Sequence, residues 1–226
     1  NTLVICTTDH GIAFPDMKCN LTDHGMGVML IMRGPGGFEG GQVVDSMVSH
    51  VDVYPTLCDL LGIDRPDWLE GQSMLPLVRG EAESIREEVF GELNLHAAYE
   101  PLRCVRTERY KYIRHFDDNR HRRLPNCDES LTKDLWLAHG WTHENVLPEH
   151  RLYDLVLDPQ ERHNVADDPA YADALRDMQA RLDRFMQATD DPIRHGPPPV
   201  HEKAEPMVNR IGDPSPNTEL VPWPEG

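Results

Sequence analysis

Apolar residues along this chain gather in short runs and helical stripes that predict a mixed α/β protein. Residues 2–6 (TLVIC) and 27–34 (GVMLIMRG) are continuous apolar runs, so we predict two buried parallel strands there. The segment 49–62 is predicted as a helix, because Ser49 and Asp52 have the spacing of a capping box and a glycine ends the segment. This order of elements indicates a sheet covered by helices on its faces.

The pattern changes after about residue 88. Four runs are predicted as antiparallel strands, at residues 89–94, 102–107, 110–116 and 151–159. The segment 168–186 is predicted as a helix, because Asp168 can cap it, Pro169 suits its first position and apolar residues form one stripe. Residues 117–150 form an irregular insertion. A small antiparallel sheet with a packed helix is therefore expected.

These patterns divide the chain into three predicted regions. Residues 1–88 form an α/β part, residues 89–189 form a small α+β subdomain, and residues 190–226 form a proline-rich extended tail. The tail is expected to wrap over a surface, on this subunit or on a partner, so a homo-oligomer held through the tail stays open.

Composition restricts the partners of this chain of 226 residues. Its formal net charge is −17, which makes nucleic acid an unsuitable partner because phosphate binding needs a basic face. No apolar run approaches the roughly 18 residues of a membrane span, so we expect no membrane insertion. An anionic substrate would have to be held by a local cation or a metal. The five cysteines contain no C-x-x-C pair, which excludes a zinc ribbon or thioredoxin motif.

The chemistry-bearing residues follow the first predicted strand directly. Asp9 and His10 stand at its C-terminal end, the edge of an open α/β sheet at which ligands bind. A carboxylate and an imidazole together suit a divalent metal. Lys18 could return over the site as a fixed cation, and we expect all three side chains in one cleft. On these residues alone, a turn cap at Asp9 and a surface histidine remain open.

Longer motifs in this order resemble the C-terminal part of a sulfatase catalytic domain in the alkaline-phosphatase superfamily. The resemblance covers nearly the whole chain and rests on TTDHG, the strand GVMLIMRG, VDVYPTLCDLLG, GQSMLPLVRG, VRTERYKYIRHF and RLYDLVLDPQERHNVADDP. DHGIAFP, ELNLHAAYEPLRCVRT and ATDDP are most similar to the heparan N-sulfatase (sulfamidase) branch. Residues 1–88 would then be the end of an alkaline-phosphatase-like α/β sandwich.

The resemblance implies one divalent cation and a covalent nucleophile. Sulfatases usually bind Ca2+ through two early acidic residues and a later pair, which Asp9 and His10 match. The cation holds a sulfate oxygen beside a formylglycine, whose hydrated aldehyde attacks sulfur. Lys18 matches the lysine that contacts sulfate. A metal and a fixed cation would stabilise the charge that builds on the sulfate oxygens.

Two departures from the sulfatase pattern matter. No cysteine or serine here stands in the C/S-x-P/A-x-R motif that is converted to formylglycine, and the early acidic pair is missing. Because the chain opens on Asn1 inside a strand-like run, we expect the nucleophile upstream and the chain alone to be inactive. His10 is a nitrogen ligand, which would also suit Mn2+, Mg2+ or Zn2+.

Two further residues are candidates for substrate contact. His96 could line the pocket from the small subdomain, and Arg103 could meet an anionic sugar; a structural histidine and an internal ion pair are the alternatives. His10 or His96 could protonate the leaving nitrogen of a sulfamate. We predict hydrolysis of sugar sulfate esters or sulfamates. The rivals are a phosphonate monoester or phosphodiester hydrolase of the same superfamily and a non-catalytic remnant that binds sulfated glycans.

Overall fold

The structure is a computed structural model that describes residues 1–196. It divides into two compact units. The first contains residues 1–9 and 28–89, and the second contains residues 10–27 and the chain from residue 90 onward. The sequence assigns residues 10–27 to the α/β part, whereas in the structure they belong to the second unit. No helix within residues 1–196 is both long and apolar enough to cross a membrane.

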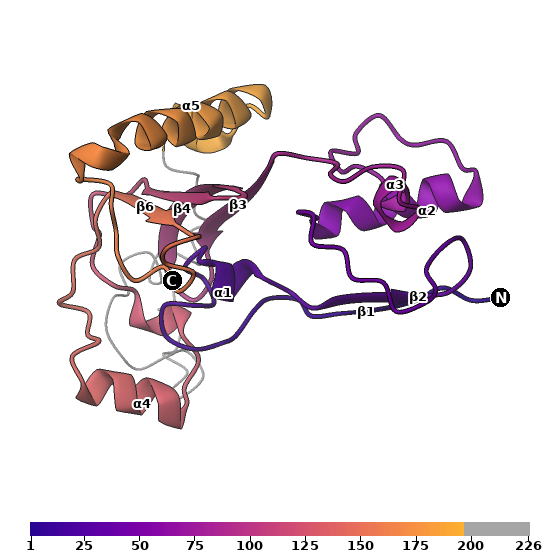
Figure 1. The fold of residues 1–226 in the computed structure, drawn as a ribbon. Helices are drawn as coiled ribbons and strands as arrows, with labels where there is room; N and C mark the ends of the chain where they lie inside the picture. The colour runs from indigo at the N-terminus through magenta and orange to yellow at the C-terminus, as the bar shows by residue number, and fades with distance from the viewer. Residues whose placement is uncertain (197–226) are drawn as a thin grey trace, which may run out of the picture. The chain divides into compact units, whose positions relative to one another are not determined.

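The described chain contains helices and strands in mixed order, and its longest helix is α5 (Figure 1). The strands are β1 (Val4–Thr7), β2 (Leu30–Arg33), β3 (Glu88–Leu95), β4 (Tyr99–Thr107), β5 (Tyr110–His115) and β6 (His150–Asp154). The α-helices are α1 (Asp23–Met26), α2 (Val53–Leu61), α3 (Leu75–Val78), α4 (Leu131–Ala138) and α5 (Ala172–Ala188). The 3₁₀ helices are η1 (His50–Asp52), η2 (Leu124–Asn126), η3 (Pro169–Tyr171) and η4 (Pro192–His195).

The first unit contains a two-stranded sheet that differs from the prediction. β1 pairs with β2 in antiparallel register, with Val4 opposite Arg33 and Thr7 opposite Leu30. The predicted parallel pairing is wrong, because a parallel pair usually needs a crossover helix and only the four-residue α1 interrupts the connection. Burial was also overestimated, since Val4 is 58% exposed and Ile31 is 57% exposed.

The predicted helix 49–62 is confirmed, as η1 followed directly by α2. The capping box is formed, with the Ser49 amide donating to Asp52 Oδ2 at 2.7 Å, and Gly62 ends the helix at a φ of 66°. Asp52 is fully buried, and it also accepts from the Gln72 amide at 2.8 Å and pairs with Arg86. One carboxylate therefore fixes the helix start to the chain that follows the helix.

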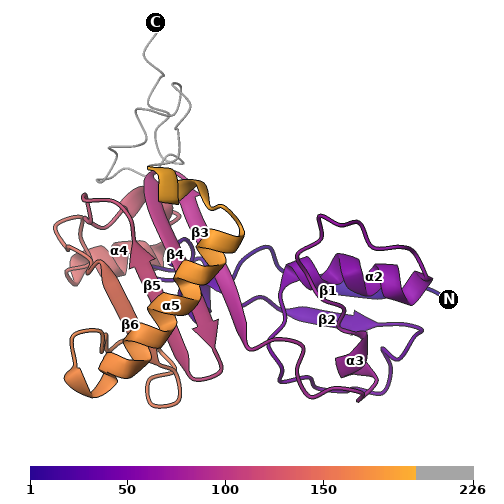
Figure 2. The same ribbon diagram turned by 90° about the horizontal axis from the view of Figure 1, so that it is seen from above.

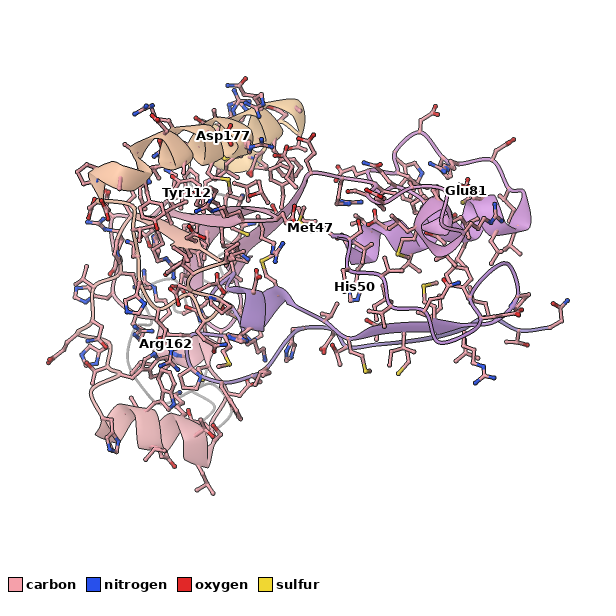
Figure 3. The ribbon with its side chains drawn as sticks, viewed as in Figure 1. Met47, His50, Glu81, Tyr112, Arg162 and Asp177 are labelled. Carbon is pink, nitrogen blue, oxygen red and sulfur yellow. The ribbon has the colours of Figure 1, made fainter. Side chains whose placement is uncertain are left out.

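The predicted small antiparallel sheet is confirmed in the second unit. Its strand order is β3-β4-β5-β6, and α5 covers one face (Figure 2). Figure 3 shows Tyr112 beneath α5, where it packs with Met178 and Leu182 of that helix, while Asp177 lies on the helix itself. Asp168 caps η3 by accepting from the Ala170 amide at 2.9 Å.

The other face of this sheet explains why residues 10–27 belong to the second unit. Side chains alternate along β5, so Ile113 faces away from Tyr112 and packs in a second core cluster with Leu21. Lys111 is fully buried, and its ammonium donates to Asp23 Oδ1 at 2.9 Å. The segment 10–27 thus covers the sheet face opposite α5.

The insertion 117–150 is more ordered than predicted. It contains η2 and α4, and Ser130 caps α4 by accepting from the Lys133 amide at 3.1 Å. Lys133 is fully buried, and its ammonium donates to Glu129 Oε1 at 2.7 Å. The helix was missed because it is short and places a lysine on its buried side.

The first residues of the predicted tail also differ from the expectation. Pro192–His195 form η4, and Ile193 packs in the core beneath α5. Apolar burial and the pairing of Asp191 with Arg103 hold this segment on the small subdomain. Residues 197–226 lie outside the described part of the chain, so oligomer contact through the tail stays a prediction.

Candidate functional site

The loop after β1 folds back on α1 and thereby sets the direction of Lys18. The Gly11 amide donates to Gly25 O at 2.9 Å, and the Lys18 amide donates to Ile12 O at 3.1 Å. A Cβ at Gly11 would lie 2.0 Å from His24 O, so only glycine fits this close approach. The D-H-G step therefore needs its glycine for backbone packing.

Lys18 is held by a carboxylate that the sequence analysis did not single out. Its Nζ donates to Asp128 Oδ2 at 2.9 Å, and the Lys18 side chain is 15% exposed. Asp128 lies between η2 and α4, inside the insertion that we predicted to be irregular. The ion pair fixes the ammonium group at the surface of the second unit.

Two histidines share the electrostatic surroundings of Lys18. Burial first, then Lys18 and more weakly His10, lower the pKa of His96, and Asp128 opposes this change. His10 Nδ1 lies 2.8 Å from Gly11 O. Because a carbonyl oxygen can only accept, Nδ1 carries the proton in this hydrogen bond, and Nε2 of the neutral ring then has the free lone pair. Lys18, Asp128 and His10 therefore all lie within electrostatic range of His96.

Asn126 fixes the turn that carries His96. Its Oδ1 accepts from the amides of Ala97 at 3.0 Å and Ala98 at 2.8 Å, and its Nδ2 donates to Glu100 Oε2 at 2.9 Å. Asn126 is 2% exposed and stands two residues before Asp128. One amide therefore ties the His96 turn to the segment that holds Lys18, and no local sequence pattern indicated this role.

Replacing Glu100 by glutamine is expected to flatten the pH dependence of stability between pH 4.5 and about 7. Burial raises the pKa of Glu100 from 4.5 to about 7, while the Asn126 hydrogen bond and then Arg151 and Arg123 oppose the rise. The folded state therefore holds this proton more tightly than the unfolded state. The proton on Glu100 stabilises the folded state fully below pH 4.5. This stabilisation, about 3 kcal/mol, is lost as the pH rises through 7.

Melting temperatures at pH 5 and pH 8 measure this effect in the full-length polypeptide. The wild type should lose more stability than the Glu100→Gln variant over that interval. His115 has a pKa lowered to about 4, mainly by burial and then by nearby arginines, so its contribution grows with pH up to about 6.5. His115 Nε2 lies 3.9 Å from Glu100 Oε1, so the difference between the two proteins reports the coupled pair of Glu100 and His115. Equal changes in both proteins would contradict the prediction.

Arg103 does not reach outward from the small subdomain. It is 1% exposed, and its Nε and Nη2 donate to the two carboxylate oxygens of Asp191 at 2.5 and 2.8 Å. Its Nη1 donates to Leu93 O at 3.1 Å and to Asn94 Oδ1 at 3.0 Å. The structure supports the internal ion pair rather than the predicted substrate contact.

The metal ligands predicted at Asp9 and His10 make at most part of a site. Asp9 is exposed and ends the first stretch of one unit, while His10 begins the other unit. Within residues 1–196 no group of three histidines, cysteines or acidic residues gathers closely enough to hold a metal. Calcium takes six to eight oxygen ligands. This donor set does not fit a complete cation site, so the metal stays a prediction.

The fold of this chain is that of sulfatases in the alkaline-phosphatase superfamily. The solved structure of a 2-O GAG sulfatase matches it with a TM-score of 0.67 and 27% identity, over 94% of this chain and 42% of that one. Residues 14–135 match the family described as "N-sulphoglucosamine sulphohydrolase, C-terminal", and the chain belongs to this family. Lys18, His96 and Asp128 all lie inside the matched range.

Two curated relatives are named as sulfatases. Human N-sulphoglucosamine sulphohydrolase is 29% identical, over 93% of this chain and 47% of its own length. An ulvan-active sulfatase of Formosa agariphila is 29% identical, over 84% of this chain and 38% of its own length. The chain therefore spans less than half of either relative.

Proposed function

We propose that this chain is the C-terminal segment of a sulfatase that removes sulfate from a sulfated amino sugar. Within that class, an N-linked sulfate is slightly favoured over an O-linked ester. The observation that carries the proposal is the Lys18 ammonium, which Asp128 holds at 2.9 Å and which acts electrostatically on His96. The family and the human relative support the choice of an amino sugar.

Lys18 would bind the sulfate group. An ammonium has three N–H donors, so the bond to Asp128 leaves others for sulfate oxygens. Since Asp128 already fixes the side chain, little reorganisation is needed when negative charge grows on those oxygens. In a chain with a net charge of −17, such a local cation is the means of holding an anion.

His96 would protonate the leaving nitrogen or oxygen. Burial and the nearby Lys18 lower the pKa of His96, so its protonated form is a stronger acid than an ordinary imidazolium. A bound sulfate would bring negative charge to this neighbourhood and favour protonation of the ring. His10 is the second candidate for the same role.

The nucleophile and most metal ligands are proposed to lie in an earlier part of a longer polypeptide. Asp9 and His10 would contribute two ligands to a divalent cation, with Ca2+ as first choice. When bound, that cation and a formylglycine would supply charge stabilisation and the attacking oxygen. Support comes from an apolar pocket of about 880 Å³ in the first unit, lined by Phe38, Met74 and Leu77, which a further part of the protein could cover.

Kinetics of the full-length polypeptide test this proposal. We would compare kcat/KM on glucosamine N-sulfate, glucosamine 6-sulfate and a phenyl phosphonate monoester. The N-sulfate is expected to be the best of the three substrates. A preference for the phosphonate by more than about a hundredfold, roughly 2.7 kcal/mol, would favour the rival hydrolase. Binding of the sulfated sugars without turnover would favour the non-catalytic glycan binder.

A further inference from the structure

A buried glutamate far from Lys18 in the sequence supports the loop that carries this lysine. Glu161 lies between β6 and η3, is 7% exposed, and accepts through Oε2 from the Asp23 amide at 2.5 Å. Asp23 is the first residue of α1, and the preceding Thr22 makes no side-chain cap bond. Because the first amides of a helix have no acceptor within it, Glu161 supplies one from a distant part of the chain.

We propose that Glu161 is a positioning residue for Lys18 and acts on it through α1. The inference rests on the proposed function, because it concerns the ammonium group that would bind sulfate. It adds a residue 143 positions further along the chain that would set the place of this ammonium group through the backbone rather than by contact with the substrate.

Backbone contacts connect α1 to Lys18. The Ile12 amide donates to His24 O at 2.9 Å, and the Lys18 amide donates to Ile12 O at 3.1 Å. A Cβ at Gly25 would lie 2.0 Å from Met17 O, so the residue before Lys18 also lies directly against the helix. A displacement of α1 would therefore displace the backbone of Lys18.

The loop between Ile12 and α1 needs such support because its backbone is strained. Asp16, Cys19 and Leu21 have φ values of 61°, 63° and 56°, in the left-handed region that favours glycine. They are three of the five non-glycine residues with positive φ within residues 1–196, so the strain is concentrated in this loop. Left-handed backbone at residues with a Cβ persists only where the surrounding structure holds it.

Glu161 itself lowers the stability of the fold where it stands. Its φ is 52°, and its Oε1 is buried with no hydrogen-bond partner within residues 1–196. Burial raises the pKa of its carboxyl group, and the nearby Lys111 opposes this rise. Left-handed backbone and a buried polar atom without a partner both destabilise a protein. Such a residue beneath the loop of a binding side chain indicates a role in function beyond folding alone.

A double-mutant cycle with Lys18 separates positioning from a loss of folded protein. In the full-length polypeptide we would measure kcat/KM on glucosamine N-sulfate for the wild type, Glu161→Ala, Lys18→Ala and the double variant. Glu161→Ala is expected to lose about tenfold in the wild-type background and less than twofold in the Lys18→Ala background. Destabilisation alone would lower kcat/KM by the same factor in both backgrounds, and that result would overturn the inference.

Two further variants test whether the hydrogen bond to α1 is the cause. Glu161→Gln keeps an oxygen acceptor for the Asp23 amide and should stay within about twofold of the wild-type kcat/KM. Arg162→Ala is the matched control, because Arg162 is the next residue in the chain (Figure 3) and is exposed. It should also change kcat/KM by less than about twofold. A loss in either variant as large as that in Glu161→Ala would contradict the inference.

Hydrogen–deuterium exchange tests the positioning without any catalysis. In Glu161→Ala the amides of residues 11–20 should exchange about tenfold faster, while those of α5 keep the wild-type rate. If the wild type hydrolyses no sulfated sugar, the proposed function fails, and this measurement still decides whether Glu161 holds the loop. Unchanged exchange in residues 11–20, or equally faster exchange throughout the protein, would overturn the inference.

Discussion

Replacing Lys18 by alanine is expected to lower kcat/KM of the full-length polypeptide on the proposed sulfated-sugar substrate by about 10²–10³-fold. The ammonium is fixed by Asp128 at 2.9 Å and would stabilise charge that grows on the sulfate oxygens. Its removal also leaves the Asp128 carboxylate without its partner, facing an anionic substrate. The steady-state kinetics of sulfate release measure the effect.

Three variants separate the charge of Lys18 from its position. Lys18→Arg keeps the cation and is expected to retain most of the activity. Asp128→Asn keeps the ammonium but weakens its anchor, so a smaller loss is expected. The double variant Lys18→Ala with Asp128→Asn should recover part of the loss if carboxylate repulsion contributes. Activity within threefold of wild type for Lys18→Ala would contradict the assigned role.

Replacing Asp191 by alanine is expected to lower the free energy of unfolding by about 3–5 kcal/mol. Asp191 accepts two hydrogen bonds from Arg103, and both side chains are nearly completely buried. The variant would leave the buried guanidinium with neutral partners and with the exposed Glu92, whose Oε2 lies 3.7 Å from Arg103 Nε. Chemical denaturation, monitored by a spectroscopic signal that reports the small subdomain, measures this loss in the free energy of unfolding.

The neighbouring aspartate provides a matched control for this stability effect. Asp190 is 79% exposed and pairs with Arg194 and His195 at the surface. Since exposed ion pairs contribute little, Asp190→Ala should change stability by less than about 1 kcal/mol. Arg103→Met combined with Asp191→Leu should recover much of the loss, because no unpaired charge remains. Similar losses in the two alanine variants would contradict the prediction.

Local patterns were enough to predict the antiparallel sheet and α5 of the second unit. The stripe along α5 and the alternation in β5 each identify a buried face, because helix and strand periods fix which side chains share one. The pattern failed for β1 and β2. A continuous apolar run predicts burial but does not tell which element buries it, and strand direction depends on the connection rather than on the strands.

The candidate site could be predicted only as far as its residues are close in sequence. His10 and Lys18 belong to one motif, and the family resemblance identified them. Asp128 is 110 residues from Lys18, and nothing in its local sequence points to that lysine. The buried ion pair of Arg103 could not be predicted either, because its pairing with Asp191 depends on where the chain turns after α5.

The small subdomain cannot be exchanged between relatives as one continuous segment, because two separate stretches of chain build it, residues 10–27 and the chain from residue 90. A fragment cut at residue 90 would lack Asp23, leaving the buried ammonium of Lys111 without its counter-ion and Arg106 without its partner. It would also uncover the sheet face that Leu21 covers. A graft has to carry residues 10–27 as well. The same segment therefore carries Lys18 and stabilises the sheet beneath it. A sequence change in this segment can affect both, so its evolution is constrained by the sheet as well as by Lys18.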